Sequence, residues 1–500
     1  MSAKSSTSCV LVWFRDDLRL ADNPALSAAA ADGTAVACVY VHDTLSPGLR
    51  PAGGASRWWR HHSLMRLDEG LANIGGALRV EHGAAEDIVV ALALSAQARA
   101  VFWNRRPGAA EAAVDAAVAA KLQVLGIEAR ACAGDMLREP SELRTGSGAG
   151  FKVFTPFWKA HRGLGDPPPP LPAPTRLVAG ALSAGPAGAR RIAALGLLPT
   201  APDWSGGLAA TWTPGEAGAR ARLAAFLDSG AKDYARLRDR PDQPATSRLA
   251  PHMHFGEISA RAVFHAVRAR EASGEIAPAD AAKFLAEVGW REFCRYMLHH
   301  FPKLGTDNVQ ARFDRFPWHV ADPRMLRAWQ RGRTGYPIVD AGMRELWHTG
   351  FMHNRVRMIC ASFLTKHLLI DWRIGEAWFW DTLCCADLAS NAANWQWVAG
   401  SGADAAPYFR IFNPVLQGQT FDPNGTYIRR FVPELASVDS LFVHTPWLAP
   451  VSSRPTDYPA PVVDHQFARR RALDAFSFIQ TAAILKPVKP PARNSPKSSR

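Results

Sequence analysis

The feature that most limits the fold is a change of hydrophobic period part-way along the 500-residue chain. Short β-branched or aromatic runs, separated by Ala-rich helical stretches, recur through the first third. The runs cover residues 9–14, 35–42, 77–82, 100–104 and 128–132. Strands that alternate with helices at this spacing predict a doubly wound, Rossmann-like parallel sheet with helices on both faces. From about residue 212 to 474 the period is helical, which predicts a second, all-helical domain.

A proline-rich stretch separates these two parts. Residues 166–174 carry six prolines, and Gly-, Ala- and Pro-rich sequence continues to about residue 202. Such sequence does not favour a regular helix or strand, so we expect a long linker. The last residues are rich in Pro, Ser and Lys, which predicts disorder. The predicted units are an α/β domain at 9–135, a linker at 136–205, a helical domain at 206–480 and a disordered basic tail at 481–500.

The formal charge of +13 at pH 7 is distributed unevenly. Residues 1–150 carry −1, residues 151–480 carry +9 and residues 481–500 carry +5. This excess on the second half and the tail predicts a polyanionic partner. The seven cysteines are scattered and form no C-x-x-C pair, which favours reduced cytosolic thiols over disulfides or structural zinc.

Several common functional motifs are absent from the sequence. The chain has no Gly-Lys dipeptide and therefore no P-loop, no G-x-G-x-x-G after the first strand, and no H-E-x-x-H. No signal peptide precedes the first strand, and no uncharged apolar run reaches ~18 residues. We therefore expect a cytoplasmic protein with no membrane span and no metal site.

Tryptophan is concentrated in the predicted helical domain. Of the 17 tryptophans, nine lie between residues 290 and 397. A packed aromatic core explains any one of them. Indoles also stack on nucleobases, at about 1–3 kcal/mol per base, and they can pass electrons to a redox cofactor. Trp395 and Trp397 stand about 200° apart on a helix, so they can serve different sites.

Polar residues at helical spacing accompany these tryptophans. Glu287, Trp290 and Arg291 share one helical face, where they suit a heterocycle, although their spacing alone favours an exposed Glu–Arg ion pair beside a core tryptophan. Asn354, Arg357 and Met358 also share a face, and the alternative there is a solvated basic stripe. Weaker signals, which also fit ordinary caps and turns, are Tyr234 with Arg238, the run 246–249, and Asp387 with Asn391.

Five longer motifs together resemble the photolyase/cryptochrome family. They are VLVWFRDDLRL at 10–20, KVFTPF at 152–157, TGYPIVDA at 334–341, NWQW at 394–397 and DAAPYFRIFNP at 404–414. The resemblance runs from about residue 9 to 475. Within the family it is closest to the class I cyclobutane pyrimidine dimer photolyases of bacteria.

The resemblance implies non-covalent FAD, active as FADH⁻, which gives one electron on excitation to a flipped-out pyrimidine dimer in ultraviolet-damaged DNA. A monomer is expected. The FAD-contact positions match Tyr234, Thr246, Ser247, Arg248, Leu249, Ala250, Phe284, Arg291, Asn354, Arg357, Cys385, Ala386, Asp387 and Asn391. The electron-relay positions match Trp318, Trp372 and Trp395. The substrate and DNA positions match Arg238, Glu287, Trp290, Asn354, Arg355, Met358, Trp397 and Gln417.

Some positions depart from the family pattern. Cys385 stands where an Asp usually pairs with the equivalent of Arg357, so we expect Arg357 to lack that partner. Phe284 replaces a frequent Trp, and Ala250 a frequent Ser. Glu111 matches a position that contacts a folate antenna, but the preceding Asn is replaced by Ala. An antenna chromophore, methenyltetrahydrofolate or another, is therefore left open.

Three other functions compete with dimer repair. A signalling cryptochrome has the same fold and FAD but repairs nothing. An enzyme that repairs (6-4) photoproducts is expected to have histidines at the positions of Asn354 and Met358, where this chain has none. A DNA-binding module that keeps flavin without photochemistry does not need the tryptophan relay. The residues favour dimer repair over each of these.

Overall fold

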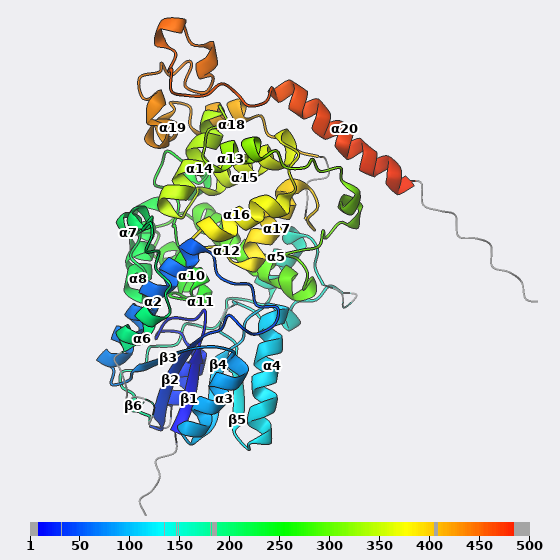
Figure 1. The fold of residues 1–500 in the computed structure, drawn as a ribbon. Coiled ribbons are helices and arrows are strands. Elements are labelled where there is room, and N and C mark those ends of the chain that lie inside the picture. Colours follow the sequence, from blue (N-terminus) through cyan, green and yellow to red (C-terminus); the bar gives the residue numbers. More distant parts are fainter. Residues whose placement is uncertain are drawn as a thin grey trace, which may run out of the picture.

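The computed structural model describes residues 9–31, 33–134, 136–146, 148, 150–180, 182, 188–404 and 409–484. Most of the predicted tail, residues 485–500, lies outside these ranges, as do residues 405–408 of the last family motif. Figure 1 shows a sheet with flanking helices at one end of the molecule and a larger helical part at the other. The predicted fold class is confirmed.

The sheet is parallel and its strands run in the order β3-β2-β1-β4-β5. The strands are β1 (Cys9–Phe14), β2 (Ala35–His42), β3 (Leu78–His82), β4 (Ala98–Asn104) and β5 (Glu128–Cys132). Val10 and Val12 pack on one face against α1 (Pro24–Ala30) and α2 (Gly54–Asn73). Leu11 and Trp13 pack on the other face against α3 (Ala85–Ser95) and α4 (Ala109–Val124). Burial on both faces explains the continuous apolar runs in the sequence.

The predicted linker holds more regular structure than its composition indicated. It contains α5 (Phe154–Gly163), α6 (Gly188–Ala194) and a short strand, β6 (Val178–Ala179), which pairs in parallel with the start of β2. The expectation that no regular helix or strand forms between residues 166 and 202 is therefore wrong at β6 and α6, whereas α5 lies before that stretch. Tertiary packing explains the difference, because buried Ile192 anchors α6 and Arg191 reaches Glu81 at 3.0 Å. The stretch 166–174, with its six prolines, is irregular as predicted.

The rest of the described chain is helical. Its α-helices are α7 (Gly206–Thr211), α8 (Glu216–Ala225), α9 (Tyr234–Leu237), α10 (Ala250–His254), α11 (Ala260–Ala272), α12 (Pro278–His300), α13 (Pro323–Gln330), α14 (Pro337–Thr349), α15 (Asn354–Ser362), α16 (Trp372–Thr382), α17 (Leu388–Ala399), α18 (Pro414–Phe421), α19 (Thr426–Phe431) and α20 (His465–Ile484). Two π-helical segments, η3 (Phe226–Gly230) and η5 (Phe363–His367), extend α8 and α15. Short 3₁₀ turns are η1 (Pro140–Glu142), η4 (Ala311–Arg315), η6 (Pro433–Leu435), η7 (Pro446–Leu448) and η8 (Val451–Ser453). None of the helices described is long and apolar enough to cross a membrane.

Direct contacts join the sheet to the helical part. The Trp59 indole N–H of α2 donates to the buried Glu257 carboxylate at 2.9 Å, and the Leu18 N–H donates to the Phe255 carbonyl at 3.0 Å. Gly256 lies at φ +66°, and a Cβ there would overlap the Asp16 carbonyl. A glycine at this position therefore lets the loop after β1 approach the helical part closely.

Candidate functional site

A cavity of about 490 Å³ opens within the helical part. Its volume lies in the range of sites that hold small molecules and cofactors, about 300–1,000 Å³. Helices α12, α15, α16 and α17 supply most of its walls. Most of the residues predicted from the sequence border it, namely Arg238, Ala250, Glu287, Trp290, Arg291, Asn354, Arg355, Arg357, Met358, Cys385, Asn391, Trp395 and Trp397.

The α12 wall carries Glu287, Trp290 and Arg291, as their spacing predicted. Glu287 forms an ion pair with Arg238, which lies beyond α9, and lies 3.7 Å from Lys283 one turn earlier. Arg291 pairs with its neighbour Glu292 at 3.0 Å. The alternative, an exposed ion pair between Glu287 and Arg291, therefore does not form. Arg238, from another segment, binds the Glu287 carboxylate instead.

Helix α15 begins at the cavity. The backbone N–H of Arg355 donates to Nδ1 of the preceding residue, His353, at 3.2 Å, and this bond caps the helix. Asn354, Arg357 and Met358 all border the cavity, as their shared helical face predicted, while their function stays a prediction. The Arg355 side chain turns toward Asp239, which it meets at 2.7 Å.

Arg357 keeps a contact to position 385 despite the change of residue type. Its Nη2 donates to Cys385 Sγ at 3.3 Å, and its Nε donates to the Met352 carbonyl at 2.6 Å. The expectation that Arg357 lacks a partner at this position is therefore wrong. The partner is a thiol in place of a carboxylate, so the guanidinium charge faces the cavity beside a group without a formal negative charge.

The corner between α16 and α17 separates this cavity from a second one. Asn391 faces the cavity, and its amide donates to the Glu376 carboxylate at 2.8 Å. Asp387 caps α17 by accepting from the Ser390 N–H at 2.7 Å. Burial opposes ionisation of Asp387, but Arg295 and other nearby groups lower its pKa overall. Asp387 and Ala386 border the second cavity and are not among the residues that line the first.

Other predicted FAD contacts lie near the cavity without lining it. Tyr234 is buried and meets Phe284 edge-on at 5.3 Å. Thr246, Ser247 and Leu249 form the turn before α10, where the Leu249 N–H lies 3.4 Å from Ser247 Oγ. Gln417 lies on α18, and its buried Oε1 has no hydrogen-bond partner among the described residues.

Arg248 is a half-buried cation in the same turn as these contacts. It has φ +53°, and its guanidinium lies 4.7 Å from the Trp212 ring and 4.8 Å from the Phe351 ring. Burial lowers its pKa. Within the described residues its Nε has no hydrogen-bond partner. A cation with a buried, unmet donor is suited to an anionic ligand.

The three predicted relay tryptophans belong to one aromatic core. Trp395 borders the cavity and packs so closely on α16 that a Cβ at position 375 would overlap its ring. Trp372, at the start of the same helix, is fully buried, and its indole N–H donates to Asn308 at 2.9 Å. Trp318 is partly buried against the same cluster. Position 375 is Gly, which makes the α16–Trp395 approach possible.

Several cavity residues were missed in the sequence. The apolar part of the wall includes Cys294, Met297, Leu304, Phe379 and Leu383, and Ser390 and Asp404 add polar atoms. The apolar members follow ordinary helical periodicity, so nothing in the sequence separates them from core residues. Asp404 opens one of the family motifs, which was a usable signal.

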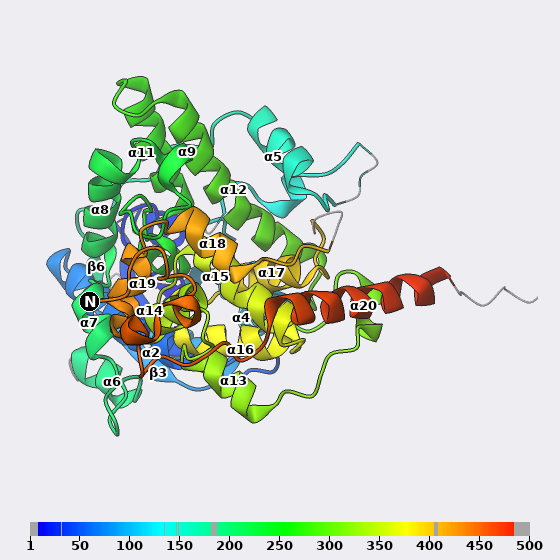
Figure 2. The ribbon, with the colours of Figure 1, turned by 90° about the horizontal axis from the view of Figure 1, so that it is seen from above.

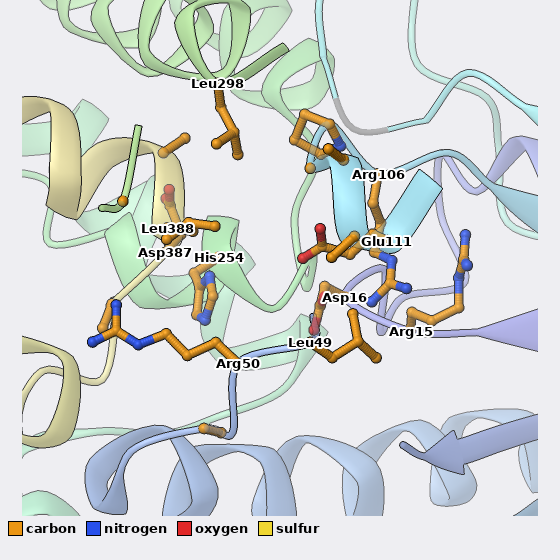
Figure 3. Close-up of a pocket in the computed structure, with 18 of the residues that line it drawn as sticks. Arg15, Asp16, Leu49, Arg50, Arg106, Glu111, His254, Leu298, Asp387 and Leu388 are labelled. Atoms are coloured by element: carbon orange, nitrogen blue, oxygen red, sulfur yellow. Dashed lines mark ion pairs between the residues drawn. The ribbon is translucent and has the colours of Figure 1, made fainter. Parts of the chain in front are cut away.

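The second cavity, of about 680 Å³, is a cleft between the sheet and the helical part. Figure 3 shows Arg106 and Glu111 on one side of it and His254 and Asp387 on the other. Glu111, the predicted antenna residue, begins α4 and borders the cleft. Its lining includes eight basic side chains, those of Arg15, Arg50, Arg60, Arg105, Arg106, Arg295, Lys303 and Arg373, and six carboxylates, those of Asp16, Asp17, Asp43, Glu111, Glu376 and Asp387. These residues have no common spacing along the chain that would predict their meeting.

Two family models match this chain. Residues 10–175 match the model of DNA photolyase, and residues 284–478 match the FAD binding domain of DNA photolyase. The chain belongs to the photolyase/cryptochrome family. The first match covers the sheet part. The second covers the helical part from within α12 to within α20.

Curated relatives and solved structures support this membership along most of the chain. The Agrobacterium fabrum deoxyribodipyrimidine photo-lyase is 49% identical over 95% of this chain and 98% of its own length. Cryptochrome-1 of Arabidopsis thaliana is 36% identical over 95% of this chain and 71% of its own length. The crystal structure of a bacterial class III photolyase from Agrobacterium tumefaciens, 48% identical, aligns with a TM-score of 0.91 over 96% of this chain and all of that one.

These matches decide several sequence-based predictions. The family, the photolyase type of enzyme and FAD as the cofactor are confirmed. The placement nearest to class I stays a prediction, since the structure at 48% identity is described as class III. The roles of individual site residues and the domain boundaries stay predictions as well.

Proposed function

We propose that this protein repairs cyclobutane pyrimidine dimers in ultraviolet-damaged DNA, using light. The observation that carries the proposal is the cavity of about 490 Å³, which brings together most of the predicted dimer contacts and several of the predicted FAD contacts, mainly from α12, α15 and α17. Its rim carries Trp290 and Trp397, two flat apolar surfaces, beside the polar groups of Glu287 and Asn354. The basic charge of residues 151–480 suits a DNA backbone around this opening.

The residues present fit FAD. Met297, Leu304, Phe379 and Leu383 offer apolar surface to a ring system, while Asn354, Asn391 and Arg357 offer amide and guanidinium groups at its edges. The buried Arg248 donor without a partner suits a phosphate. When bound, reduced FAD supplies a light-driven electron to the pyrimidine dimer.

The protein's own side chains bind and orient the dimer. A dimer must leave the duplex stack to reach a buried cofactor, and Trp290 and Trp397 would receive it as walls. Glu287, held by Arg238 and Lys283, would accept hydrogen bonds from the pyrimidine imide groups. Arg355, next to Asp239, lies at the same rim and would meet a flanking phosphate.

The tryptophan relay would bring electrons in from the surface. Trp395 lies at the cavity, Trp372 is fully buried in the adjoining helix, and Trp318 is the partly buried member. This order from cavity to exterior supports an inward electron path. It also argues against a DNA-binding module that keeps flavin without photochemistry.

The decisive experiment is light-dependent repair with purified, reduced protein. An oligonucleotide with one thymine dimer is incubated under blue light and in the dark, and restored thymines are counted by chromatography. We expect repair only in the light, and none of an oligonucleotide with a (6-4) photoproduct. FAD-bound protein that restores no thymines in the light would reject repair and favour the cryptochrome alternative.

We further propose that the interdomain cleft of about 680 Å³ holds an antenna chromophore. The basic side chains in its lining suit an anionic, conjugated ligand such as methenyltetrahydrofolate, and Glu111 lies at the edge of the cleft. Arg50 forms a bidentate ion pair with Glu376 at 2.8 and 2.9 Å, and this pair would form part of the wall of the cleft. Binding to the purified protein should quench the fluorescence of the folate in a titration. Glu111→Ala should weaken this binding. No binding by the wild type would reject the antenna proposal.

A further inference from the structure

Helix α5 places an aromatic ring against a wall of the cavity. The Phe154 ring stacks on the Trp290 ring with centroids 3.8 Å apart and planes at 9° (α5 and α12 lie side by side in Figure 2). Trp158, one turn later in α5, is nearly parallel to Phe154, at 6.3 Å and 12°. Of these three rings, it is Trp290 that lines the cavity. One face of the Trp290 indole is therefore occupied by the protein itself.

The surroundings hold this stack in place. A Cβ at position 289, directly before Trp290, would come 2.6 Å from the Trp158 ring, so Gly289 lets α5 lie close to α12. Phe293, one turn after Gly289, meets Trp290 edge-on at 5.9 Å and 77°, and meets Phe154 at 6.0 Å and 72°. The Trp290 indole is thus contacted on one face and at one edge.

The start of α5 is also tied to the segment after α17. The Phe154 N–H donates to Asp404 Oδ2 at 3.2 Å, and Asp404 borders the cavity. In the same segment, the Gly402 N–H donates to the Gln396 carbonyl of α17 at 3.0 Å. Helix α17 carries Trp397, the other proposed wall. The first residue of α5 therefore contacts Trp290 directly and reaches the Trp397 side through Asp404.

We propose that Phe154 is a positioning residue for damage recognition, holding the Trp290 indole in one orientation where a flipped pyrimidine dimer binds. The inference rests on the proposed function and assigns a role to the KVFTPF motif at 152–157. A wall that is already ordered loses less conformational freedom when a ligand stacks on it. A Trp290 without its stacking partner would have to be ordered at the moment of binding. Recognition of the dimer should weaken, while contacts to undamaged backbone should not.

The test compares affinity for two duplexes, one with a thymine dimer and one undamaged, in the dark. Phe154→Ala should lower the ratio of the two affinities about 2- to 12-fold, the equivalent of about 0.5–1.5 kcal/mol for an aromatic pair. Phe154→Tyr keeps a flat ring and should keep the ratio. Lys159→Ala, at an exposed position of α5, changes one charge and should affect both duplexes alike. FAD content and the thermal midpoint are measured for each variant.

The outcomes separate this inference from the proposed function. A ratio for Phe154→Ala equal to that of the wild type would overturn the positioning role. If Phe154→Ala loses FAD or does not fold, Phe154→Leu is measured in its place, since it fills volume without a flat ring. The same fall in ratio supports the role and an unchanged ratio overturns it. A wild type with no preference for the dimer would instead reject the proposed function.

Discussion

Acid should destabilise helix α15, which carries Asn354, Arg355, Arg357 and Met358, and His353 is the reason. This side chain is 4% exposed and caps α15 by accepting from the Arg355 N–H. A ring nitrogen can accept this bond only while it carries no proton. The charge of Asp239 favours the protonated ring, whereas the charges of Arg357 and Arg238 add to the effect of burial. Burial lowers the pKa of His353 from 6.5 to about 4.

The sign and size of the effect follow from this pKa. Above pH 6.5 the ring is neutral in both the folded and the unfolded chain, so its contribution to stability is complete. As pH falls from 6.5 to about 4, the unfolded chain takes up a proton that the folded chain does not, and stability is lost. At about 1.36 kcal/mol per pKa unit, the loss reaches about 3 kcal/mol near pH 4.

His353→Asn isolates this contribution. Asparagine is a good helix N-cap and carries no charge at any of these pH values. Urea unfolding from about pH 7 to about pH 4 should show a smaller loss of stability in the variant, by about 3 kcal/mol, and retention of FAD should follow the same curve. His42→Asn is the matched control, because burial lowers the pKa of His42 to about 4 in the distant sheet. When the release of FAD by acid is compared with the global unfolding of the same protein, His42→Asn should behave as the wild type does. Identical pH profiles for wild type and His353→Asn would refute the reasoning.

Other perturbations test the cavity walls. Cys385→Asp places a carboxylate beside Arg357, so the midpoint potential of bound FAD, measured by spectroelectrochemical titration, should become more negative; no shift or a positive one would contradict this. Gly375→Ala overlaps the Trp395 ring and should lower stability by about 1–3 kcal/mol in thermal unfolding, whereas an unchanged midpoint would show that α16 can move. Trp397→Ala should weaken dimer binding by about 1–3 kcal/mol with FAD retained, and an unchanged dissociation constant would remove it from the wall.

Local geometry explains which parts of the fold could be predicted. The buried strands of the sheet stand out because burial on both faces requires apolar runs, as in β1. No element was predicted for the residues of α5, although Phe154, Phe157, Trp158 and His161 recur at i, i+3, i+4 and i+7. Its Pro156 stands in the first turn, where proline is tolerated. Helix α6 carries one buried apolar residue, so its stability comes from packing against distant segments and leaves little local signal.

The same distinction holds for the site. The faces of α12 and α15 followed from helical spacing, because residues at i, i+3 and i+4 point the same way in any helix. The partners of these residues did not follow, since Arg238 reaches Glu287 and Cys385 reaches Arg357 from other segments. Pairing across tens of residues depends on how helices pack, which a single sequence does not encode locally.

The corner between α16 and α17 makes the two cavities interdependent. One short segment supplies Ala386 and Asp387 to the interdomain cleft and Cys385 and Asn391 to the helical cavity. Glu376 adds a second link, because it binds Arg50 of the sheet part on one side and the Asn391 amide on the other. A ligand that displaced Arg50 in the cleft would change the charge balance on Glu376 and therefore the hydrogen bond that orients Asn391. We therefore expect occupancy of the cleft to change the orientation of the Asn391 amide in the helical cavity through Glu376.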